Sequence, residues 1–236
     1  RPKLQIAKKL VAEWAQDLQR NEKATQWLAE NRGITAETAR RYELGFDSKT
    51  GRITIPVRDQ TGACWNVRMY SASADTAKMI NYKNGAHSYG SPPRLYGLDE
   101  LVESPPGGEF ILCEGEWDCL LLRQAGFLAV TGTHGAETFQ REWLAYFKDR
   151  DVVVLYDCDE AGKQAASALV LPALTLSEAR SIKNVALPLA GTKDEKDVTD
   201  FWRLHSESWA TDLRKIIDNT PEYHQAKAPI DPALRR

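Results

Sequence analysis

Two short apolar runs that end in carboxylates constrain the fold of this chain more than any other feature. The first run, 111–113, leads into Glu114. The second, 152–156, leads into Asp157 and Asp159. Continuous apolar runs of this length are typical of strands buried on both faces of a parallel sheet. Because functional groups gather at the carboxyl ends of strands in open α/β sheets, neighbouring strands would bring these three carboxylates together.

The second half of the chain alternates between strand and helix patterns. The expected strands are 110–114, 127–132, 152–156 and 182–189, and the expected helices are 116–125, 136–148, 160–170 and 198–218. This alternation predicts an α/β fold with a mostly parallel sheet and helices on both of its faces.

The first half is organised differently. Apolar residues at helical spacing predict helices at 4–18 and 24–30, and Thr35 is placed to cap a third helix. This helical region has the character of a scaffold, and we expect no catalytic group from it. Residues 52–58 and 63–70 alternate between apolar and polar positions, which predicts a β-hairpin.

We expect four parts along the chain. They are an N-terminal helical region at 1–50, a smaller basic α+β subdomain at 51–106, an α/β catalytic domain at 107–220, and a linker or disordered tail at 221–236. The subdomain would hold the hairpin and a long polar loop at 71–93. The run of two prolines and two glycines at 105–108 is the boundary signal before the catalytic domain.

The net charge of −2 hides an uneven distribution of charge. Between Arg40 and Arg94 there are nine basic and four acidic residues, whereas the chain after Glu109 is acidic overall. A basic part beside an acidic part suits a polyanionic partner that is steered towards a metal site. An ordinary solvated face would also account for the basic excess.

The carboxylates at the strand ends favour metal chemistry. Such a cluster repels itself unless a cation is present. Hard oxygen ligands select Mg²⁺ or Mn²⁺, which stabilise the attacking and leaving oxygens in phosphoryl transfer. Asp197 is a further candidate ligand, while Asp194 and Asp200 are equally consistent with turn and helix-capping roles. The alternative is that all these acids cap helices and that the glycines only make turns.

Two weaker signals follow the second and third expected strands. The small-residue loop at 131–136 could present backbone N–H groups to a phosphate, although His134 fits an ordinary loop residue equally well. Lys163 could reach a phosphate or lie in solvent.

The cysteines and the apolar runs limit the class of protein. The four cysteines form no C-x-x-C pair, which favours reduced, buried side chains in a cytosolic protein and gives no reason to expect zinc. No apolar run approaches the roughly 18 residues of a membrane span, and no signal-peptide pattern is present at the start. A chain that begins at Arg1 fits a piece of a larger protein.

The two acidic segments resemble the TOPRIM domain of topoisomerases and primases. They read Glu114-Gly-Glu-Trp-Asp118 and Asp157-Cys-Asp159-Glu-Ala-Gly162, and an acidic Lys-Asp segment follows them. Within that group the chain is similar to the RNA-polymerase core of DnaG-type primases and of phage or mitochondrial-type primase–helicases. The segments that carry this narrower resemblance are 27–46, 51–62, 78–81 and 94–98.

The resemblance implies a primase that copies single-stranded DNA into short RNA primers from NTPs, with Mg²⁺ or Mn²⁺ as the cofactor. It makes Glu114, Asp157 and Asp159 catalytic residues. The implied metal ligands are Glu114, Asp118, Asp157, Asp159 and Asp197, with Asp118 acting by ligation or by hydrogen bonding. Together with the weaker signals above, the residues expected to bind DNA or nucleotide are Arg52, Arg58, Arg68, Lys78, Asn81, Arg94 and Lys163.

The chain departs from the family pattern in two respects. Family members commonly have a zinc-binding domain ahead of the core, and this sequence shows no such motif. Many also have a lysine shortly before the segment at 95–98, where this chain has Ser91-Pro-Pro-Arg94. Arg94 is the expected substitute for that lysine.

The resemblance also implies partners and a location. The expected partners are a single-stranded DNA template, NTPs and a replicative helicase, either fused or separate. The expected location is the cytoplasm of a bacterium or a phage-infected cell, with no membrane contact. Two other functions stay open: a metal-dependent TOPRIM nuclease, and a non-catalytic module that binds DNA or a helicase.

Overall fold

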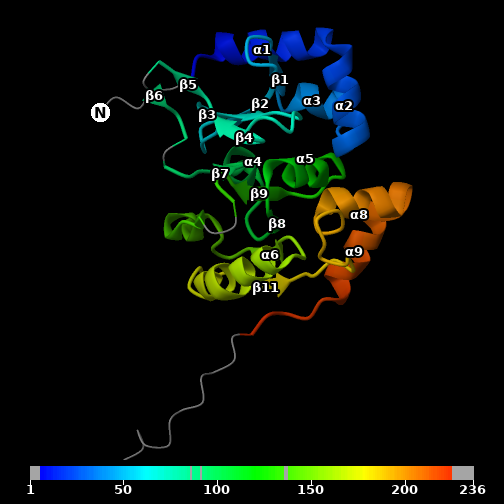
Figure 1. Cartoon of the computed structure of the whole chain (residues 1–236). Helices are drawn as coiled ribbons and strands as arrows, with labels where there is room; N and C mark the ends of the chain where they lie inside the picture. The colour runs from blue at the N-terminus through cyan, green and yellow to red at the C-terminus, as the bar shows by residue number, and fades with distance from the viewer. Residues whose placement is uncertain (1–5, 86, 91, 136–137, 225–236) are drawn as a thin grey trace, which may run out of the picture.

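The computed structural model describes residues 6–85, 87–90, 92–135 and 138–224. Figure 1 shows two sheets with their helices, one above the other in that view, and the N-terminal helices α1 and α2 lie at the top. Among the helices that the structure describes, none has the length and apolar character needed to cross a membrane.

The three expected N-terminal helices are present. They are α1 (Lys8–Arg20), α2 (Glu22–Arg32) and α3 (Ala36–Arg41). The side chain of Asn21 accepts a hydrogen bond from the Ala24 N–H at 3.1 Å and begins α2. Gly33 ends α2 in the left-handed conformation, with a φ of 66°. Thr35 caps α3 by accepting from the Thr38 N–H at 3.2 Å.

An antiparallel sheet follows these helices, in the order β1-β2-β3-β4. Its strands are β1 (Gly45–Asp47), β2 (Arg52–Arg58), β3 (Cys64–Tyr70) and β4 (Met79–Asn81). Strands β2 and β3 form the expected hairpin, in which the Asp59 carboxylate accepts from the Thr61 and Ala63 N–H groups at 2.8 and 3.1 Å.

Short strands occur where the sequence predicted none. Strand β1 lies in the expected helical region, and β4 lies in the expected loop at 71–93, together with the small pair β5 (Lys83–Asn84) and β6 (His87–Ser88). The expectation of an unbroken loop was therefore wrong. Strands of two or three residues are too short to show an alternating pattern, and β4 is fixed by its pairing with β3.

The second sheet has the order β11-β10-β8-β9-β7. Its strands are β7 (Leu95–Tyr96), β8 (Glu109–Cys113), β9 (Ala129–Gly132), β10 (Asp151–Leu155) and β11 (Ser181–Asn184). The pairs β11–β10, β10–β8 and β8–β9 are parallel, and β7 is antiparallel to β9. The expected mostly parallel α/β sheet is confirmed. It also takes in β7, which precedes the boundary expected at 105–108.

Helices cover both faces of this sheet, as expected. Ile111 and Cys113 of β8 pack on one side with α5 (Glu116–Gln124), α8 (Val198–His205) and α9 (Trp209–Asn219). Phe110 and Leu112 pack on the other side with α4 (Leu98–Glu103), α6 (Glu160–Ala165) and α7 (Leu171–Leu174). Because neighbouring side chains of a strand point to opposite faces, one short apolar run supplies both cores.

One of the two cores also joins the two sheets. Leu28 of α2 and Ile55 of β2 belong to the same buried cluster as Leu121 of α5 and Phe201 of α8. The N-terminal part therefore packs directly on the parallel-sheet part, and groups at the junction are held in fixed relative positions.

The prediction of a helix at 136–148 is wrong for the residues of this range that the structure describes. Residues 136 and 137 lie outside the described residues, and the remainder forms a short 3₁₀ helix, η2 (Arg141–Tyr146). Thr138 Oγ1 donates to the Gly135 carbonyl and Gln140 Nε2 donates to the Thr138 carbonyl, both at 2.9 Å. These local bonds compete with an α-helical turn.

Three other expected elements differ in extent. The helix expected at 198–218 breaks at Ser206, which has a φ of 48°, and a 3₁₀ turn, η4 (Ser206–Ser208), separates α8 from α9. The helix expected at 160–170 continues through a π-helical segment, η3 (Ala166–Val170), into α7. The strand expected at 182–189 ends at Asn184, because its neighbour β10 ends at Leu155.

The first residues of the expected linker or tail contact the parallel sheet. The Tyr223 N–H donates to the Ile182 carbonyl at 2.6 Å, and Glu222 forms a bridge with Lys183. Residues 225–236 lie outside the described residues.

The shared core predicts a large difference between two leucines. Leu121 is 0% exposed and Leu204 is 58% exposed. Leu121→Ala should lower the free energy of unfolding by about 2–5 kcal/mol through lost burial and a residual cavity. The matched variant Leu204→Ala should stay within about 0.5 kcal/mol of the unchanged protein. Urea unfolding of both variants measures this, and equal losses would contradict the assignment of the shared core.

Candidate active site

Glu114 and Asp157 leave the sheet side by side. Strands β8 and β10 are parallel, with Cys113 opposite Leu155, so the residues that follow them emerge at the same edge. A cavity of about 300 Å³ lies there, at the junction with the antiparallel sheet. Its lining residues are Arg32, Arg68, Met79, Glu114, Gly115, Glu116, Trp117, Asp118, Gly132, Gly135, Asp157, Lys196 and Asp197. Glu114 and Asp157 therefore face a pocket that both parts of the chain build.

Asp157 and Asp159 share one cation. The Lys196 ammonium lies 2.8 Å from Asp157 Oδ2 and 2.7 Å from Asp159 Oδ2. This contact shows that the side chains of Asp157 and Asp159 point to the same side of the loop. Asp159 also caps α6 by accepting from the Gly162 N–H at 2.9 Å. Gly162 is required at that point, because a Cβ there would lie 2.3 Å from the Asp157 carbonyl oxygen.

Asp118 and Asp197 are linked through the first turn of α8. Asp118 Oδ1 accepts from the Thr199 N–H at 3.1 Å and from the Thr199 hydroxyl at 2.8 Å. Asp197 caps the same helix by accepting from the Asp200 N–H at 2.8 Å, and the Asp200 carboxylate accepts from the Asp197 N–H in return. Asp118 therefore fixes the helix end that carries Asp197, and Asp200 has the capping role that the sequence allowed for it.

The acidic groups have different proton affinities. Burial, together with the nearby Glu114 carboxylate, raises the pKa of Asp157 to about 7. Burial also raises the pKa of Glu114 and of Asp118, with neighbouring carboxylates adding to both effects. Asp159 differs, because hydrogen bonds from Lys196 and from the Gly162 N–H lower its pKa. Buried carboxylates with raised pKa values at a strand edge are typical of functional sites.

The donor groups fit a hard divalent cation. Among the described residues, Glu114 Oε2 is buried and has no hydrogen-bond partner. The surrounding candidate ligands are carboxylate oxygens, which Mg²⁺ and Mn²⁺ prefer. Within the described residues, no three acidic, histidine or cysteine side chains are already arranged around a metal position. The Lys196 ammonium lies between two of the candidate ligands instead.

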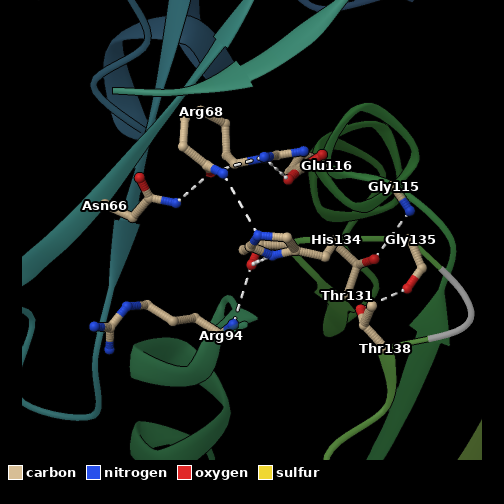
Figure 2. A network of polar contacts seen from close by, with 11 residues as sticks. Asn66, Arg68, Arg94, Gly115, Glu116, Thr131, His134, Gly135 and Thr138 are labelled. Atoms are coloured by element: carbon tan, nitrogen blue, oxygen red, sulfur yellow. Dashed lines mark hydrogen bonds and ion pairs between the residues drawn. The ribbon is translucent and has the colours of Figure 1, made fainter. Parts of the chain in front are cut away.

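A polar network joins the two sheets beside the pocket (Figure 2). Arg68 of β3 is buried, and it donates to Glu116 of α5 and to Asn81 of β4, each at 2.8 Å. The Asn81 amide nitrogen lies 3.4 Å from Nε2 of His134, which belongs to the loop after β9. Burial and the charge of Arg68 lower the pKa of His134. Three of the sequence-predicted loop and hairpin residues thus meet at one edge of the pocket.

Other residues expected to bind DNA or nucleotide lie elsewhere. Arg52 is buried and donates to the carbonyls of Met69 and Ala77 at 3.2 and 2.9 Å. Arg58 pairs with Glu43. The guanidinium groups of Arg52 and Arg58 thus contact residues of the antiparallel sheet and of the segments that flank it.

The remaining three also lie outside the pocket lining. The Arg94 guanidinium lies over the ring of Trp65, 5.6 Å from its centre, and Figure 2 shows it pointing away from His134. Lys78 and Lys163 are exposed. Of the seven basic and amide residues expected to bind polyanions, Arg68 alone is among the pocket-lining residues.

Arg32 is a pocket residue that the sequence did not single out. Its guanidinium lies within 6 Å of the ring centres of Trp27, Tyr70 and Trp117, and it donates to the Tyr70 hydroxyl at 3.1 Å. The N-terminal helices, from which no catalytic group was expected, therefore contribute a side chain to the pocket lining. An arginine in the last turn of a helix is common, so its position in the sequence carried no signal.

Comparisons with known proteins agree with this geometry. A Toprim-like family model matches residues 111–202, which include the ends of β8 and β10 and the Lys196–Asp197 segment. The crystal structure of the Aquifex aeolicus primase, with its zinc-binding and RNA polymerase domains, has a TM-score of 0.72 at 22% identity over 91% of this chain and 60% of that chain. The structure of the DnaG catalytic core has a TM-score of 0.69 at 21% identity over 91% of this chain and 78% of that one.

The chain has the fold of a TOPRIM primase core. A DNA primase of Pasteurella multocida is 30% identical over 166 residues, which are 69% of this chain and 28% of that protein. The chain spans between 22% and 47% of the length of the curated DNA primases that it matches. A Toprim-like domain also implies the use of a divalent metal ion.

The raised pKa of Asp157 predicts the pH dependence of stability without metal. Because its folded-state pKa of about 7 exceeds the ordinary value of 3.8, the folded state binds the proton more tightly than the unfolded state. In EDTA the protein should therefore lose stability as the pH rises from about 4 to about 7, and then level off.

Asp157→Asn removes this titration. Its fall in Tm between pH 5 and pH 8 should be smaller by at least about 2 °C, the shift that roughly 1 kcal/mol gives in a chain of this size. The exposed Asp194→Asn is the matched control, and its profile should follow that of the unchanged protein. Parallel profiles for Asp157→Asn and the unchanged protein would rule out this role for Asp157.

Proposed function

We propose that the chain is the RNA-polymerase core of a DNA primase, which makes short RNA primers from NTPs on a single-stranded DNA template. The observation that carries this proposal is one pocket in which Glu114 and Asp157 face Arg32 and Arg68. Carboxylates can hold a divalent ion and arginines can hold phosphates, and a nucleoside triphosphate in nucleotidyl transfer needs both. The names of the curated relatives support the same activity.

Each acidic residue has a role in this proposal. Glu114, Asp157, Asp159 and Asp197 would hold the catalytic Mg²⁺ or Mn²⁺. Such ions, when bound, stabilise charge on the attacking and leaving oxygens. Asp118 acts through hydrogen bonding, because its Oδ1 accepts both bonds from Thr199 and so orients the helix end that bears Asp197.

Glu114 has a second role. Within the part of the chain that the structure describes, its Oε2 lacks a hydrogen-bond partner, and burial raises the pKa of this carboxyl group. This oxygen is therefore suited to accept the proton of a primer 3′-hydroxyl. Arg68, held in place by Glu116 and Asn81, lines the pocket and would contact a triphosphate there. Arg32, clamped by three aromatic rings, is a second rigid positive charge at the same site.

The template would approach over the antiparallel sheet and its exposed loop, where Lys78 lies. The proposed partners are single-stranded DNA, NTPs and a replicative helicase, either fused or separate. The proposed location is the cytoplasm of a bacterium or a phage-infected cell.

The proposal predicts separate effects on catalysis and on DNA binding. Glu114→Gln and Asp157→Asn should each reduce metal-dependent primer synthesis at least roughly a hundredfold, because each removes a charged oxygen from the reacting centre. Their affinity for single-stranded DNA should be unchanged. Glu103→Gln, an exposed acid of α4, is the control with full activity. Unchanged primer synthesis in both site variants would contradict the site assignment.

The same assay separates polymerisation from cleavage. Labelled single-stranded DNA is incubated with Mg²⁺ or Mn²⁺, with and without NTPs. A polymerase core extends products only with NTPs, whereas cleavage of the DNA in their absence would identify a nuclease. If the protein binds DNA but catalyses neither reaction, it is a non-catalytic binding module.

Lys78 provides a test of the template path. Lys78→Met should weaken binding to single-stranded DNA and reduce the slope of log affinity against log salt by about 0.7, the value for one phosphate contact. The matched control is Lys23→Met, an exposed lysine of α2, which should leave the slope unchanged. Filter binding at several salt concentrations measures both, and an identical slope for Lys78→Met and Lys23→Met would exclude Lys78 from the path.

A further inference from the structure

Both the backbone and the side chain of Lys196 are held by hydrogen bonds. Its backbone is fixed, because its N–H donates to Asp200 Oδ2 at 3.0 Å and its carbonyl accepts from the Cys158 N–H at 2.8 Å. Its side chain reaches over the acidic loop, and the ammonium bridges Asp157 and Asp159. Because the side chain is 29% exposed, it can swing without any change in the backbone.

The ammonium and a divalent ion compete for the same oxygens. Mg²⁺ binds carboxylate oxygens at about 2.0–2.1 Å, and an ammonium cannot keep contacts of 2.8 and 2.7 Å to both carboxylates while such an ion occupies the space between them. An ion bound between Asp157 and Asp159 therefore requires release of Lys196. The other carboxylates of the pocket that are candidate metal ligands, Glu114 and Asp197, would be occupied by the ion. A released ammonium beside Arg32 and Arg68 therefore gains a new partner when an anion enters with the metal.

We propose that Lys196 is an exchangeable internal cation that couples the metal to the nucleotide. Without nucleotide, Lys196 occupies the Asp157–Asp159 pair and weakens metal binding. With a triphosphate in the pocket, the ammonium moves to the phosphates and leaves the carboxylates to the metal. This inference rests on the proposed function for the identity of the anion.

The test is calorimetric titration with Mn²⁺, with and without a non-hydrolysable NTP. Lys196→Met keeps the length of the side chain and removes its charge. It should bind Mn²⁺ alone more tightly than the unchanged protein, on the order of tenfold, since no ammonium competes. The gain in Mn²⁺ affinity that the nucleotide gives should be smaller in this variant. Lys196→Arg retains a competing charge and should keep Mn²⁺ binding weak, and Lys193→Met, an exposed lysine of the same loop, should match the unchanged protein.

The inference is overturned if Lys196→Met binds Mn²⁺ no more tightly than the unchanged protein. It is also overturned if the nucleotide strengthens Mn²⁺ binding equally in both. These readouts do not depend on primer synthesis. A protein that shows the coupling but makes no primers would keep the inference and lose the proposed function.

Lys196→Met leaves two acids without their cation, so a second measurement uses the unchanged protein. Acylation of lysines by an activated ester, read by mass spectrometry, should modify Lys196 faster when Mn²⁺ is added and more slowly when the non-hydrolysable NTP follows. Lys193 serves as the internal control, because its modification should not change. A Lys196 rate that stays constant on adding Mn²⁺ would overturn the exchange.

Discussion

The parallel pairing of β8 with β10 is the constraint on which the site depends. It brings Glu114 next to Asp157, although 43 positions separate them in the chain, and burial there makes the charge of each costly. Neighbouring groups offset the free-energy cost of burying these charges. Lys196 supplies a positive charge, backbone N–H groups at two helix starts satisfy Asp159 and Asp197, and Thr199 satisfies Asp118. The buried carboxylates at the carboxyl ends of β8 and β10 thus explain both why nearby groups must stabilise this part of the fold and why a cation is favoured there.

The parts of the fold that local patterns determine could be predicted from the sequence. The apolar runs of β8 and β10 fixed both the strands and the position of the acids at their ends. Thr35 marked a helix start, and the alternation on either side of Asp59 marked the hairpin. Each of these signals acts over a few residues, so no tertiary contact was needed to recognise it.

The parts that depend on distant contacts could not be predicted in this way. Arg32 becomes a pocket residue only because Tyr70 and Trp117, from two other elements, enclose it. Arg52 was expected to bind DNA or nucleotide, yet its guanidinium donates hydrogen bonds to the backbone carbonyls of Met69 and Ala77. The sequence does not reveal whether the charge of a basic residue faces solvent, a ligand or the backbone. Only the tertiary structure shows whether such a residue is available to bind a ligand or instead stabilises the fold.

The buried ion pair of Arg68 with Glu116 has an evolutionary consequence. Its partners come from different sheets, and their side chains are 11% and 7% exposed. Loss of either partner alone leaves an uncompensated buried charge, which typically costs about 3–5 kcal/mol, whereas joint replacement by well-packed apolar residues is often tolerated. Joint replacement would also remove the Arg68 charge that the proposed function assigns to the triphosphate. Arg68 and Glu116 should therefore be retained together among homologous chains that keep this function.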